Sequence, residues 1–587
     1  MFEISLRKVA LCAAVAALVL IVPLDALFTQ SVRITAAVGA LMALLWLTEA
    51  VPMGMTALVP LIAFPLTGVS SMEKTAAPYA NSAVFLFMGG FLVAATFERW
   101  GLHRRMAFFA LRNVGTEPRR IVFAVILVTA FLSMWISNTA TTLMMTPIVV
   151  AIVGGLGAKR EEAGSTEART AEATLLGVAF AASLGGLGTP IGTPTNLIFL
   201  GAVRELFPTA KTITFAEWLV FGSAYLVLMV PICWLLVVVT ARVPKGAAVP
   251  LESLGIERPG SMSRAEKTAL LLCAATALLW IFRADIALGA TILPGWARIF
   301  PNAKMINDAT VAIAMAVLAF MLPAGGGKRL LEWAEFKRIP WDVLILFGGG
   351  FALADAFETS GFSKWAGARL SFVGGWAPVL MILAMCIVVT LLSEVASNVA
   401  TATAMMPIAA ALSTSIGVHP YFLMLPAVMA ASSGFMLPVA TAPNTIVYST
   451  GFIRVRAMAR SGVMLDIAAA IVITLLMFLV VPWATGIDLR VPLKVVERRS
   501  STGRSADLRS AVSREAYPRL PAEGRRTGRR NVGAPKKAAG LSARRFTFAE
   551  LVSYFPAERR RPGWPMVVWP EALKGTKTRA IPRAELP

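Results

Sequence analysis

The 587-residue chain has little charge, almost no histidine and few cysteines. Only 15% of its residues are charged while 57% are hydrophobic, which is more apolar surface than a water-soluble core hides. The two histidines, His103 and His419, have no partner at metal-ligand spacing, so histidine metal sites and Ser-His-Asp catalysis are excluded, and no enzyme is expected. The cysteines fall in apolar stretches without a framework spacing and are interpreted as small core residues: Cys12, Cys233, Cys273 and Cys386.

Positive charge is concentrated at the carboxyl end of the chain. Residues 487–587 hold 23 Lys or Arg against nine Asp or Glu, and so carry +14 of the formal +22. The segment is rich in Arg, Pro, Gly and Ser, which is typical of a disordered extension. The excess therefore belongs to a tail, and no nucleic-acid partner is expected.

Apolar runs long enough to cross about 30 Å of hydrocarbon recur along the chain. We expect eleven spans, near residues 9–24, 36–50, 53–67, 81–98, 172–202, 214–241, 268–283, 306–323, 341–357, 421–450 and 463–485. Two further apolar stretches, 121–156 and 376–414, are interrupted midway by small polar residues. The first run follows Arg7 and Lys8 as a signal peptide would, but no clear A-x-A cleavage pattern follows it, so a retained helix is preferred.

The charge of the loops sets the expected topology. If residues 35–67 hold two spans and each interrupted stretch returns to its own side, the cytoplasmic loops hold 23 Lys or Arg and the outside loops nine. A single span there would put the six basic residues from Arg99 to Arg120 outside, against the positive-inside rule. We therefore predict an all-α polytopic protein of the cell (inner) membrane, with about 11 transmembrane helices in the lipid bilayer and a cytoplasmic amino terminus.

The chain contains two copies of one unit. Leu86–Gly101 and Leu132–Ile148 recur 260 residues later, at nine of sixteen and nine of seventeen positions. Further on the offset becomes 248, where four residues match four others: Pro190, Thr193, Asn196 and Ile198 meet Pro438, Thr441, Asn444 and Ile446. Five spans per copy, an odd number, require the copies to lie inverted in the bilayer, with a site at the midplane between them.

These features divide the chain into five parts. We expect a first transmembrane helix and loop (1–35), a first inverted repeat (36–241) with a hairpin near 121–156, a cytoplasmic loop (242–267), a second inverted repeat (268–486) with a hairpin near 376–414, and the basic, disordered tail (487–587). Every duplicated motif lies upstream of the tail.

Both interrupted stretches carry a polar tripeptide at membrane depth. The first copy has Ser137-Asn138-Thr139 and the second has Ser397-Asn398-Val399. A turn at this depth frees backbone N–H and C=O groups that lipid cannot satisfy. Ser and Asn supply oxygen ligands for a cation, while Asn amides and helix-start N–H groups suit a carboxylate. One such tripeptide alone would favour a contact that holds helices together, but its recurrence at the repeat offset favours a binding site instead.

Two other spans contain helix-breaking motifs, at Gly188–Asn196 and Leu437–Asn444. Prolines and glycines inside an apolar span break the helix and expose carbonyls on one half and N–H groups on the other. An ordinary proline kink is the alternative, which the four breakers in the nine residues of the first motif disfavour. No Lys or Arg falls in any of the four motifs, so only bound cations and helix-start dipoles could balance an anion there.

These motifs resemble the divalent anion:sodium symporter family. The two tripeptides, the stretch from Ser393 to Asn398 and above all the run from Phe435 to Gly451 carry the resemblance, which covers about Leu6 to Gly486. It implies two inverted repeats, each with a re-entrant hairpin and an unwound helix, a homodimer, and elevator-type movement of the site. It also implies sodium-coupled secondary active transport of small dicarboxylates of the succinate, malate or fumarate type. A sulfate or tricarboxylate symporter, or a sodium-independent dicarboxylate exchanger, stays open as an alternative.

The resemblance also implies roles for individual residues. One sodium site would use Ser133, Ser137 and Asn138 with the backbone of Gly192, and its mate would use Ser393, Ala396 and Asn398 with the backbone of Ala440. The dicarboxylate would lie between the hairpin tips, against Ser137, Asn138, Thr139, Thr193, Pro194, Ser397, Asn398, Val399, Thr441 and Ala442. Co-transported sodium is therefore the expected cofactor, and no organic cofactor is expected.

The sequence departs from the family pattern at two positions of the second copy. Val399 lacks the hydroxyl of Thr139, and Ala442 stands where some members have proline. Glu394, beside the second tripeptide, is an ionisable group at membrane depth and so a functional candidate, but a buried structural carboxylate is an equal alternative.

Overall fold

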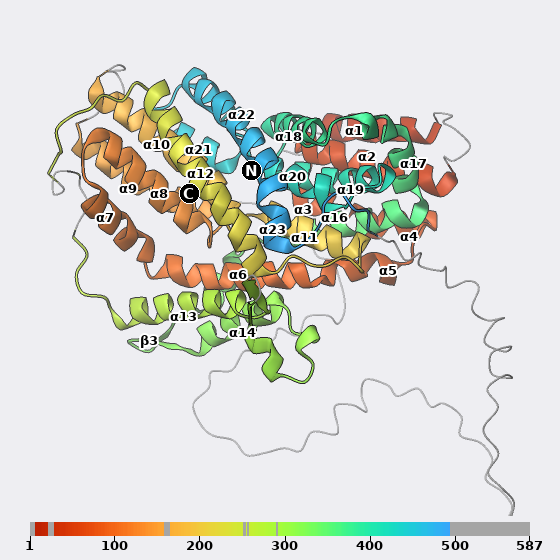
Figure 1. Cartoon of the computed structure of the whole chain (residues 1–587), viewed down its shortest axis with the longest axis horizontal. Helices are drawn as coiled ribbons and strands as arrows, with labels where there is room; N and C mark the ends of the chain where they lie inside the picture. Colours follow the sequence, from red (N-terminus) through yellow and green to blue (C-terminus); the bar gives the residue numbers. More distant parts are fainter. Residues whose placement is uncertain are drawn as a thin grey trace, which may run out of the picture. The chain divides into compact units, whose positions relative to one another are not determined.

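Figure 1 shows the computed structural model of the chain, which describes residues 6–21, 29–157, 165–250, 254, 258–288 and 291–493. The chain divides into a compact unit, Met1–Arg498, and a second unit, Arg499–Pro587, which lies wholly outside the described residues. The predicted tail, residues 487–587, lies outside them from residue 494 onward. Its first residues are described, and Ile487 and Leu489 are buried in the first unit.

The described chain is almost entirely helical. The first half contains α1 (Leu6–Ile21), α2 (Gln30–Thr48), α3 (Met53–Thr56), α4 (Val59–Thr67), α5 (Met72–Ala76), η1 (Ala77–Ala80), α6 (Ser82–Arg99), α7 (Leu102–Val114), α8 (Pro118–Ser133), α9 (Asn138–Gly155), α10 (Thr166–Gly186), α11 (Pro194–Leu206) and α12 (Phe215–Thr240). The second half contains α13 (Arg264–Ile281), η3 (Trp296–Ile299), η4 (Ala303–Met305), α14 (Asp308–Met321), α15 (Trp333–Arg338), α16 (Trp341–Ser360), α17 (Phe362–Leu370), η5 (Ser371–Gly375), α18 (Pro378–Val395), α19 (Asn398–Ser415), α20 (Tyr421–Ala431), α21 (Ala442–Ser449), α22 (Val455–Leu479) and α23 (Val481–Thr485). Short antiparallel hairpins pair β1 (Ile286–Leu288) with β2 (Thr291–Leu293), and β3 (Pro323–Gly325) with β4 (Lys328–Arg329).

Within the described ranges, seven helices are long and apolar enough to cross a membrane. They are α2, Met72–Arg99 (which ends in α6), α9, α12, α16, α18 and α22. Shorter apolar helices cover Met53–Thr67, Asp308–Met321 and Tyr421–Ala431. The predicted class of helical, multi-pass membrane protein is confirmed, and the count of eleven spans stays a prediction.

The interruptions predicted from the sequence coincide with helix ends. In the first copy α8 ends at Ser133 and α9 begins at Asn138, and in the second α18 ends at Val395 and α19 begins at Asn398. The motifs rich in proline separate α10 from α11 and α20 from α21. We call the segments 187–193 and 432–441 the first and second breaks.

Two helices lie where the sequence predicts loops. Helices α7 and α17 fall within 99–120 and 358–375, where basic residues interrupt the apolar runs. Helix α7 is amphipathic, and Ala107, Phe108 and Leu111 are buried on one of its faces. The period of its apolar residues, and not the length of an apolar run, is the signal that indicates this helix.

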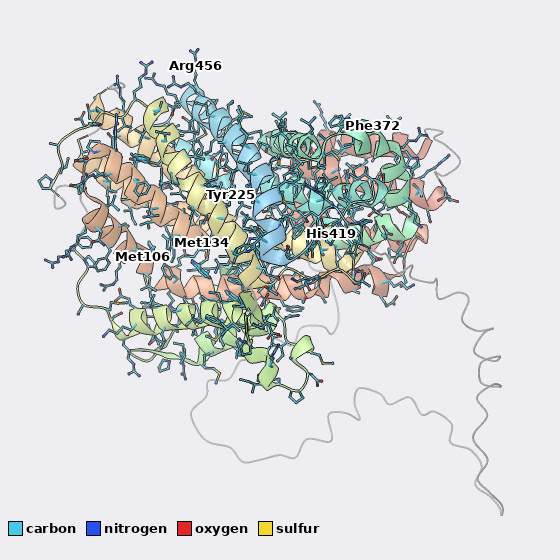
Figure 2. The ribbon with its side chains drawn as sticks, in the orientation of Figure 1. Met106, Met134, Tyr225, Phe372, His419 and Arg456 are labelled. Atoms are coloured by element: carbon cyan, nitrogen blue, oxygen red, sulfur yellow. The ribbon has the colours of Figure 1, made fainter. Side chains whose placement is uncertain are left out.

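Each hairpin packs on the helix that leads into a break. Helices α8 and α9 contact α10, and α18 and α19 contact α20. In Figure 1, α6 runs beneath both groups of helices, with α13 and α14 packed along it, while α12 and α22 lie side by side across the middle. Side chains fill the spaces between these ribbons (Figure 2). The arrangement buries the whole first break, whereas in the second break residues 436–438 are half-buried and Val439 is exposed.

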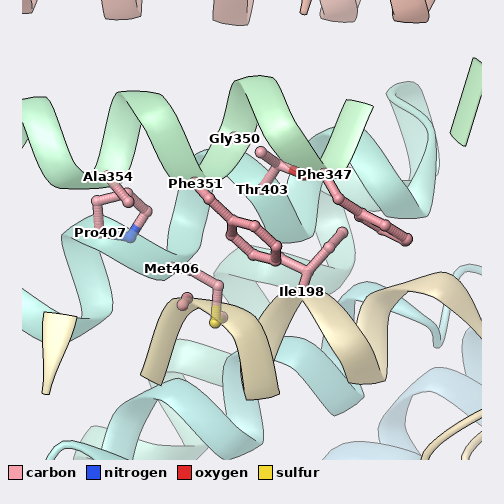
Figure 3. Close-up of a pocket in the computed structure, with 9 residues that line it drawn as sticks. Ile198, Phe347, Gly350, Phe351, Ala354, Thr403, Met406 and Pro407 are labelled. Carbon is pink, nitrogen blue, oxygen red and sulfur yellow. The ribbon is translucent and has the colours of Figure 1, made fainter. Parts of the chain in front are cut away.

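A small void lies between α11, α16 and α19 (Figure 3). Its volume of about 10 Å³ is at the lower limit for one water molecule. Apart from Thr403 its lining is apolar, and includes Phe347, Phe351 and Met406. We interpret it as a packing gap, because its size and polarity suit no anion.

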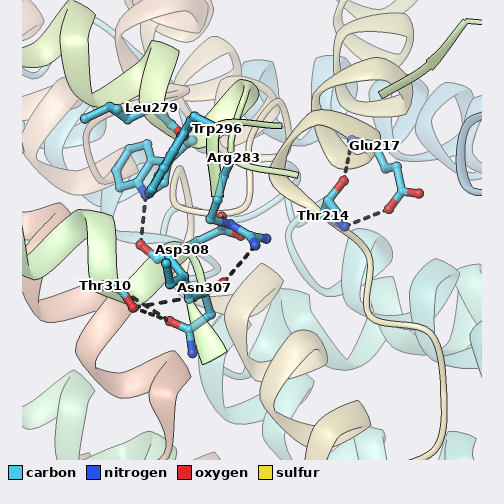
Figure 4. A network of polar contacts seen from close by, with 10 residues as sticks. Thr214, Glu217, Leu279, Arg283, Trp296, Asn307, Asp308 and Thr310 are labelled. Carbon is cyan, nitrogen blue, oxygen red and sulfur yellow. Dashed lines mark hydrogen bonds and ion pairs between the residues drawn. The ribbon is translucent and has the colours of Figure 1, made fainter. Parts of the chain in front are cut away.

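Polar contacts fix the ends of the helices around α13 (Figure 4). Arg283, just after α13, forms an ion pair with Asp308 at the start of α14. The indole of Trp280 donates to the carbonyl of Asp308 at 3.0 Å. At the start of α12, Thr214 and Glu217 cap each other reciprocally, with N–H to oxygen distances of 2.8 and 3.2 Å. The Thr214 and Glu217 pair thereby supplies partners for N–H groups at the start of α12, which a helix start leaves unpaired.

An ion pair ties α7 to the start of α13. Arg105 Nε donates to Glu266 Oε1 at 2.6 Å, and its Nη2 donates to Oε2 at 3.1 Å. Glu266 also accepts the N–H of Ser263, which precedes α13, at 2.6 Å. Because Arg105 hydrogen-bonds the ionised carboxylate, the pKa of Glu266 falls to about 2.

We expect Glu266→Gln to lower the free energy of unfolding by about 1 kcal/mol, because the amide keeps part of the cap but loses the ion pair. The folded pKa lies below the ordinary value of 4.5, so this stabilisation is complete above that pH and is lost as the pH falls toward about 2. Thermal unfolding of the detergent-purified protein across the acid range measures it. Glu117→Gln, in an exposed pair with Arg120, is the matched control and should change little. Equal losses in the two variants would contradict the role given to Glu266.

Candidate functional site

The tip of the first hairpin gathers oxygen atoms around one hydroxyl. Ser133 Oγ lies 2.9 Å from Oδ1 of Asn138 and 2.6 Å from the carbonyl oxygen of Ala182 on α10. Ser133 is fully buried and Asn138 is 8% exposed. The hydroxyl has a single hydrogen, so it donates to one acceptor at a time and lone pairs face one another in the cluster. Neutral oxygen atoms in such a group are the ligands that hard cations prefer.

The second hairpin tip repeats this arrangement. Ser393 Oγ lies 2.9 Å from Oδ1 of Asn398 and 2.6 Å from the carbonyl oxygen of Ala431 on α20. Of the residues predicted to bind sodium, Ser133 lies with Asn138 at the first tip and Ser393 lies with Asn398 at the second. Their role as ligands stays a prediction.

The serine of each tripeptide caps the helix that follows it. The N–H of Ala140 donates to Ser137 Oγ at 3.4 Å, and the N–H of Ala400 donates to Ser397 Oγ at 3.2 Å. Ser397 Oγ also lies 3.4 Å from the sulfur of Met53 on α3. The first N–H groups of α9 and α19 point toward the tips, where the helix dipole is positive.

An asparagine side chain spans each break. Both asparagines belong to the helix-breaking motifs of the sequence, but no role was predicted for them. Asn196 Nδ2 donates to the carbonyl oxygens of Gly186, at 2.9 Å, and Thr189, at 2.8 Å. Asn444 Nδ2 donates to the carbonyl oxygens 10 and 7 residues before it, at 3.3 and 2.9 Å. Both side chains are fully buried. These amides partner the carbonyls that a broken helix frees, and the match of Asn196 with Asn444 at the repeat offset is the signal that could have revealed them.

Glu394 supplies further partners at the second break. Its Oε1 accepts the N–H of Met436 at 2.8 Å and its Oε2 accepts the N–H of Leu437 at 2.9 Å. The side chain is 2% exposed. Glu394 is therefore a buried, hydrogen-bonded carboxyl group, which is one of the two interpretations that the sequence left open. The repeat places Met134 at the equivalent position of the first copy.

The first half of the site is packed more tightly than the second. A Cβ atom on Gly192 would lie 2.5 Å from the carbonyl oxygen of Gly186, so only glycine fits, whereas the equivalent residue of the second half is Ala440. A Cβ atom on Gly186 would lie 2.3 Å from Asn138 Oδ1. On the equivalent Gly434 it would meet nothing closer than 3.4 Å. The duplicated oxygen clusters therefore sit in surroundings of different tightness.

Direct contacts join the second break to the two helices that flank the first break. Thr195 Oγ1 and Ser432 Oγ are 2.6 Å apart, and both side chains are fully buried. The rings of Phe180 and Phe435 meet edge to face at 5.4 Å. Helix α21 packs against α9, and α11 packs against α19, so each helix that follows a break contacts the hairpin of the other half. The four motifs therefore form one neighbourhood.

The remaining predicted residues lie at the rim of this neighbourhood with different exposures. Ala396 is half-buried just after α18, and its N–H donates to Leu392 at 3.0 Å. Thr441 Oγ1 accepts the N–H of Asn444 at 3.1 Å. The predicted substrate residues range from buried to exposed: Thr193 and Thr441 are buried, Pro194 and Val399 are half-buried, and Thr139 and Ala442 are exposed.

The difference in tightness predicts different outcomes for matched substitutions. Gly186→Ala should lower the free energy of unfolding by about 1–3 kcal/mol, because the added carbon overlaps Asn138. Gly434→Ala is the control and should change it by about 0.5 kcal/mol or less. Neither glycine has a positive φ, so backbone strain does not enter the comparison. Thermal unfolding in detergent measures both, and a Gly434→Ala loss as large as that of Gly186→Ala would refute the difference in packing.

Comparisons with known proteins agree with these features. The family profile described as the sodium:sulfate symporter transmembrane region matches residues 4–485. The sodium-dependent dicarboxylate transporter SdcS of Staphylococcus saprophyticus is 37% identical over 461 residues, which cover 76% of this chain and 86% of the relative. SdcS of Staphylococcus aureus strain NCTC 8325 is 36% identical over 459 residues, with the same coverage.

Among solved structures, MtrF of Neisseria gonorrhoeae, from a class of antimetabolite efflux pumps, is 14% identical with a TM-score of 0.49, covering 71% of this chain and 84% of its own. No conclusion rests on that distant likeness. The match over nearly the whole membrane part, together with the relatives, shows that the chain belongs to the sodium:sulfate symporter family, the divalent anion:sodium symporters that its motifs resemble.

Proposed function

We propose that this multi-pass membrane protein is a secondary active transporter that carries small dicarboxylates of the succinate, malate or fumarate type together with sodium ions. The observation that carries the proposal is the duplicated cluster of buried neutral oxygens around Ser133 and Ser393. The relatives named as sodium-dependent dicarboxylate transporters support it. No catalytic role is proposed for any residue.

The charges of the site give the coupling its physical basis. The four motifs contain no Lys or Arg. A dianion placed in so neutral and buried a site would lose its hydration without gaining a counter-charge. Two bound sodium ions would supply that charge beside the helix starts, whose N–H groups then meet the carboxylates. Sodium is therefore an obligatory partner in the proposed cycle.

We propose the following ligands from the geometry and the family resemblance together. The first sodium ion takes the oxygens of Ser133, Ser137 and Asn138 with the carbonyl of Gly192. The second takes the oxygens of Ser393 and Asn398 with the carbonyls of Ala396 and Ala440. The substrate lies between the tripeptides, with Thr193, Pro194, Thr441 and Ala442 at its sides. The close approach of position 192 to the first oxygen cluster supports the first assignment.

The finer architecture is part of the proposal. We propose eleven spans in the cell membrane with a cytoplasmic amino terminus, and two inverted repeats, 36–241 and 268–486, joined by the loop 242–267. The matched hydrogen bonds of the two tips and of Asn196 and Asn444 support the duplication. A homodimer and elevator-type movement are proposed from the family resemblance.

Uptake by the full-length protein in proteoliposomes tests the function. Succinate should accumulate against its gradient when sodium is outside, and replacement of sodium by choline should abolish uptake. Sulfate and citrate in excess should compete weakly, because the relatives are named for dicarboxylates. Undiminished uptake in potassium medium without sodium would refute the symport and leave the exchanger alternative. Stronger transport of sulfate or citrate would refute the substrate class.

The two ends of the proposed substrate site differ, because Val399 lacks the hydroxyl group that Thr139 supplies in the first half. Val399→Thr adds a hydroxyl with little change in volume, and a hydrogen bond to a charged group contributes roughly 1.5–3 kcal/mol. We expect the apparent affinity for succinate to rise several-fold while sodium activation stays unchanged, because the proposed sodium ligands are other residues. Thr139→Val, the mirror substitution, should weaken the affinity for succinate. If Val399→Thr altered sodium activation and left succinate affinity unchanged, the side chain would belong to the cation site.

A further inference from the structure

A methionine from the first half of the chain reaches the tip of the second hairpin. Ser397 Oγ donates to the sulfur of Met53 at 3.4 Å, although 344 positions separate the two residues along the chain. Met53 is the first residue of α3 and is half-buried. The proposed function assigns Ser397 to the substrate but gives Met53 no role, so this contact needs an explanation of its own.

The corner between α2 and α3 holds Met53 in place. Glu49, at the end of α2, has a φ of 47°, a conformation that few residues other than glycine adopt. The buried indole of Trp46 on α2 donates to the carbonyl of Met53 at 3.3 Å. A Cβ atom on Gly349 of α16 would lie 2.2 Å from the carbonyl oxygen of Ala57, so the end of α3 touches α16 directly. The backbone around Met53 is therefore held by both α2 and α16.

The same corner supports the helix that follows the second tip. Ala400, in the first turn of α19, is 3% exposed and belongs to one apolar cluster with Trp46 and Ala57. Met53 packs against this cluster. Helix α19 contacts both α2 and α16, and α3 lies against α16 (Figure 1). The second tip therefore rests on a surface that α2, α3 and α16 supply.

The first tip has no equivalent of this contact in the described part of the chain. Ser137 Oγ accepts the N–H of Ala140 from its own hairpin, and no hydrogen bond joins its side chain to another helix among the described residues. Thr139, two residues further on, is exposed. The methionine is thus a feature of the second end of the proposed substrate site.

The chemistry of the contact leaves Ser397 available to a substrate. Its Oγ accepts the N–H of Ala400 at 3.2 Å, so its one hydrogen is directed at the sulfur of Met53. A thioether is a weak acceptor and has no hydrogen to donate, so a carboxylate oxygen readily takes its place. A carboxylate oxygen bound to this Oγ would lie about 2.7 Å from it, and so within about 6 Å of the sulfur. Whatever binds Ser397 therefore meets the Met53 side chain.

We propose that Met53 is a specificity-determining residue, which forms an apolar wall at the second end of the substrate site and limits the length of the dicarboxylate. This inference rests on the proposed function, because it concerns the same site. A dicarboxylate with one more methylene than succinate presses its second carboxylate against Met53. The wall does not retreat, because Trp46 and α16 hold its backbone.

Competition of succinate and glutarate for sodium-driven uptake by the full-length protein in proteoliposomes tests the wall. Met53→Ala should lower the ratio of the apparent affinities, succinate over glutarate, by about tenfold, because the enlarged end accepts the extra methylene. Met53→Leu keeps an apolar side chain of similar volume without the sulfur and should keep the wild-type ratio. Met55→Ala, at a methionine of the same helix that is 51% exposed, is the matched control and should also keep it.

The ratio separates a wall from a side chain that only packs the fold. An unchanged ratio in Met53→Ala together with a lower free energy of unfolding would overturn the proposal, and so would an equal fall in Met53→Leu or Met55→Ala. If Met53→Ala does not transport, the shifts in unfolding temperature that succinate and glutarate produce in the purified variant give the same comparison. A wild type that takes up no succinate with sodium would overturn the proposed function itself, whereas normal wild-type uptake with an unchanged ratio would overturn only the role of Met53.

Discussion

The structure depends on one constraint, which is that backbone groups freed by a break inside an apolar bundle need polar partners. The breaks between α10 and α11 and between α20 and α21 free several such groups. Asn196 and Asn444 each bind two of the carbonyls, and Glu394 binds two of the N–H groups. With those groups satisfied, the oxygens around Ser133 and Ser393 are left as the polar cluster of each hairpin tip. The proposed cation sites therefore lie beside the breaks, whose unpaired backbone groups would otherwise destabilise the fold.

The two halves satisfy this constraint with different residues. In the first half, Gly186 and Gly192 let the backbone close tightly around Asn138, and Met134 stands where the second half has a carboxylate. In the second half Ala440 replaces the glycine and Glu394 caps the break. A tight cluster and a looser one beside a carboxyl group would offer a cation different surroundings. The duplication therefore supplies two related sites of unequal character.

The duplicated side chains could be predicted from the sequence, because an offset of 260 or 248 exposes them directly. That signal, together with the length of the apolar runs, predicted the helical membrane class and the positions of the hairpins and breaks. It also predicted the serine and asparagine pairs. The hydrogen bonds of Ser133 and Ser393 to the carbonyls of Ala182 and Ala431 could not be predicted, because a backbone acceptor leaves no mark on residue type. The Thr195 to Ser432 contact crosses between the copies and has no duplicated partner, so no offset reveals it. Helix α7 was missed because its basic residues hide an amphipathic period.

Charge sets the order of events in the proposed cycle. The oxygen clusters suit cations, but the four motifs hold no fixed positive charge for a dicarboxylate. A dianion entering before sodium would lose its hydration in a buried site without a counter-charge, which is unfavourable. In the proposed cycle, sodium bound first at the two tips supplies the positive charge that the four motifs lack. The free energy released by sodium is therefore used to admit the anion, so coupling follows from the absence of basic residues and needs no separate gate.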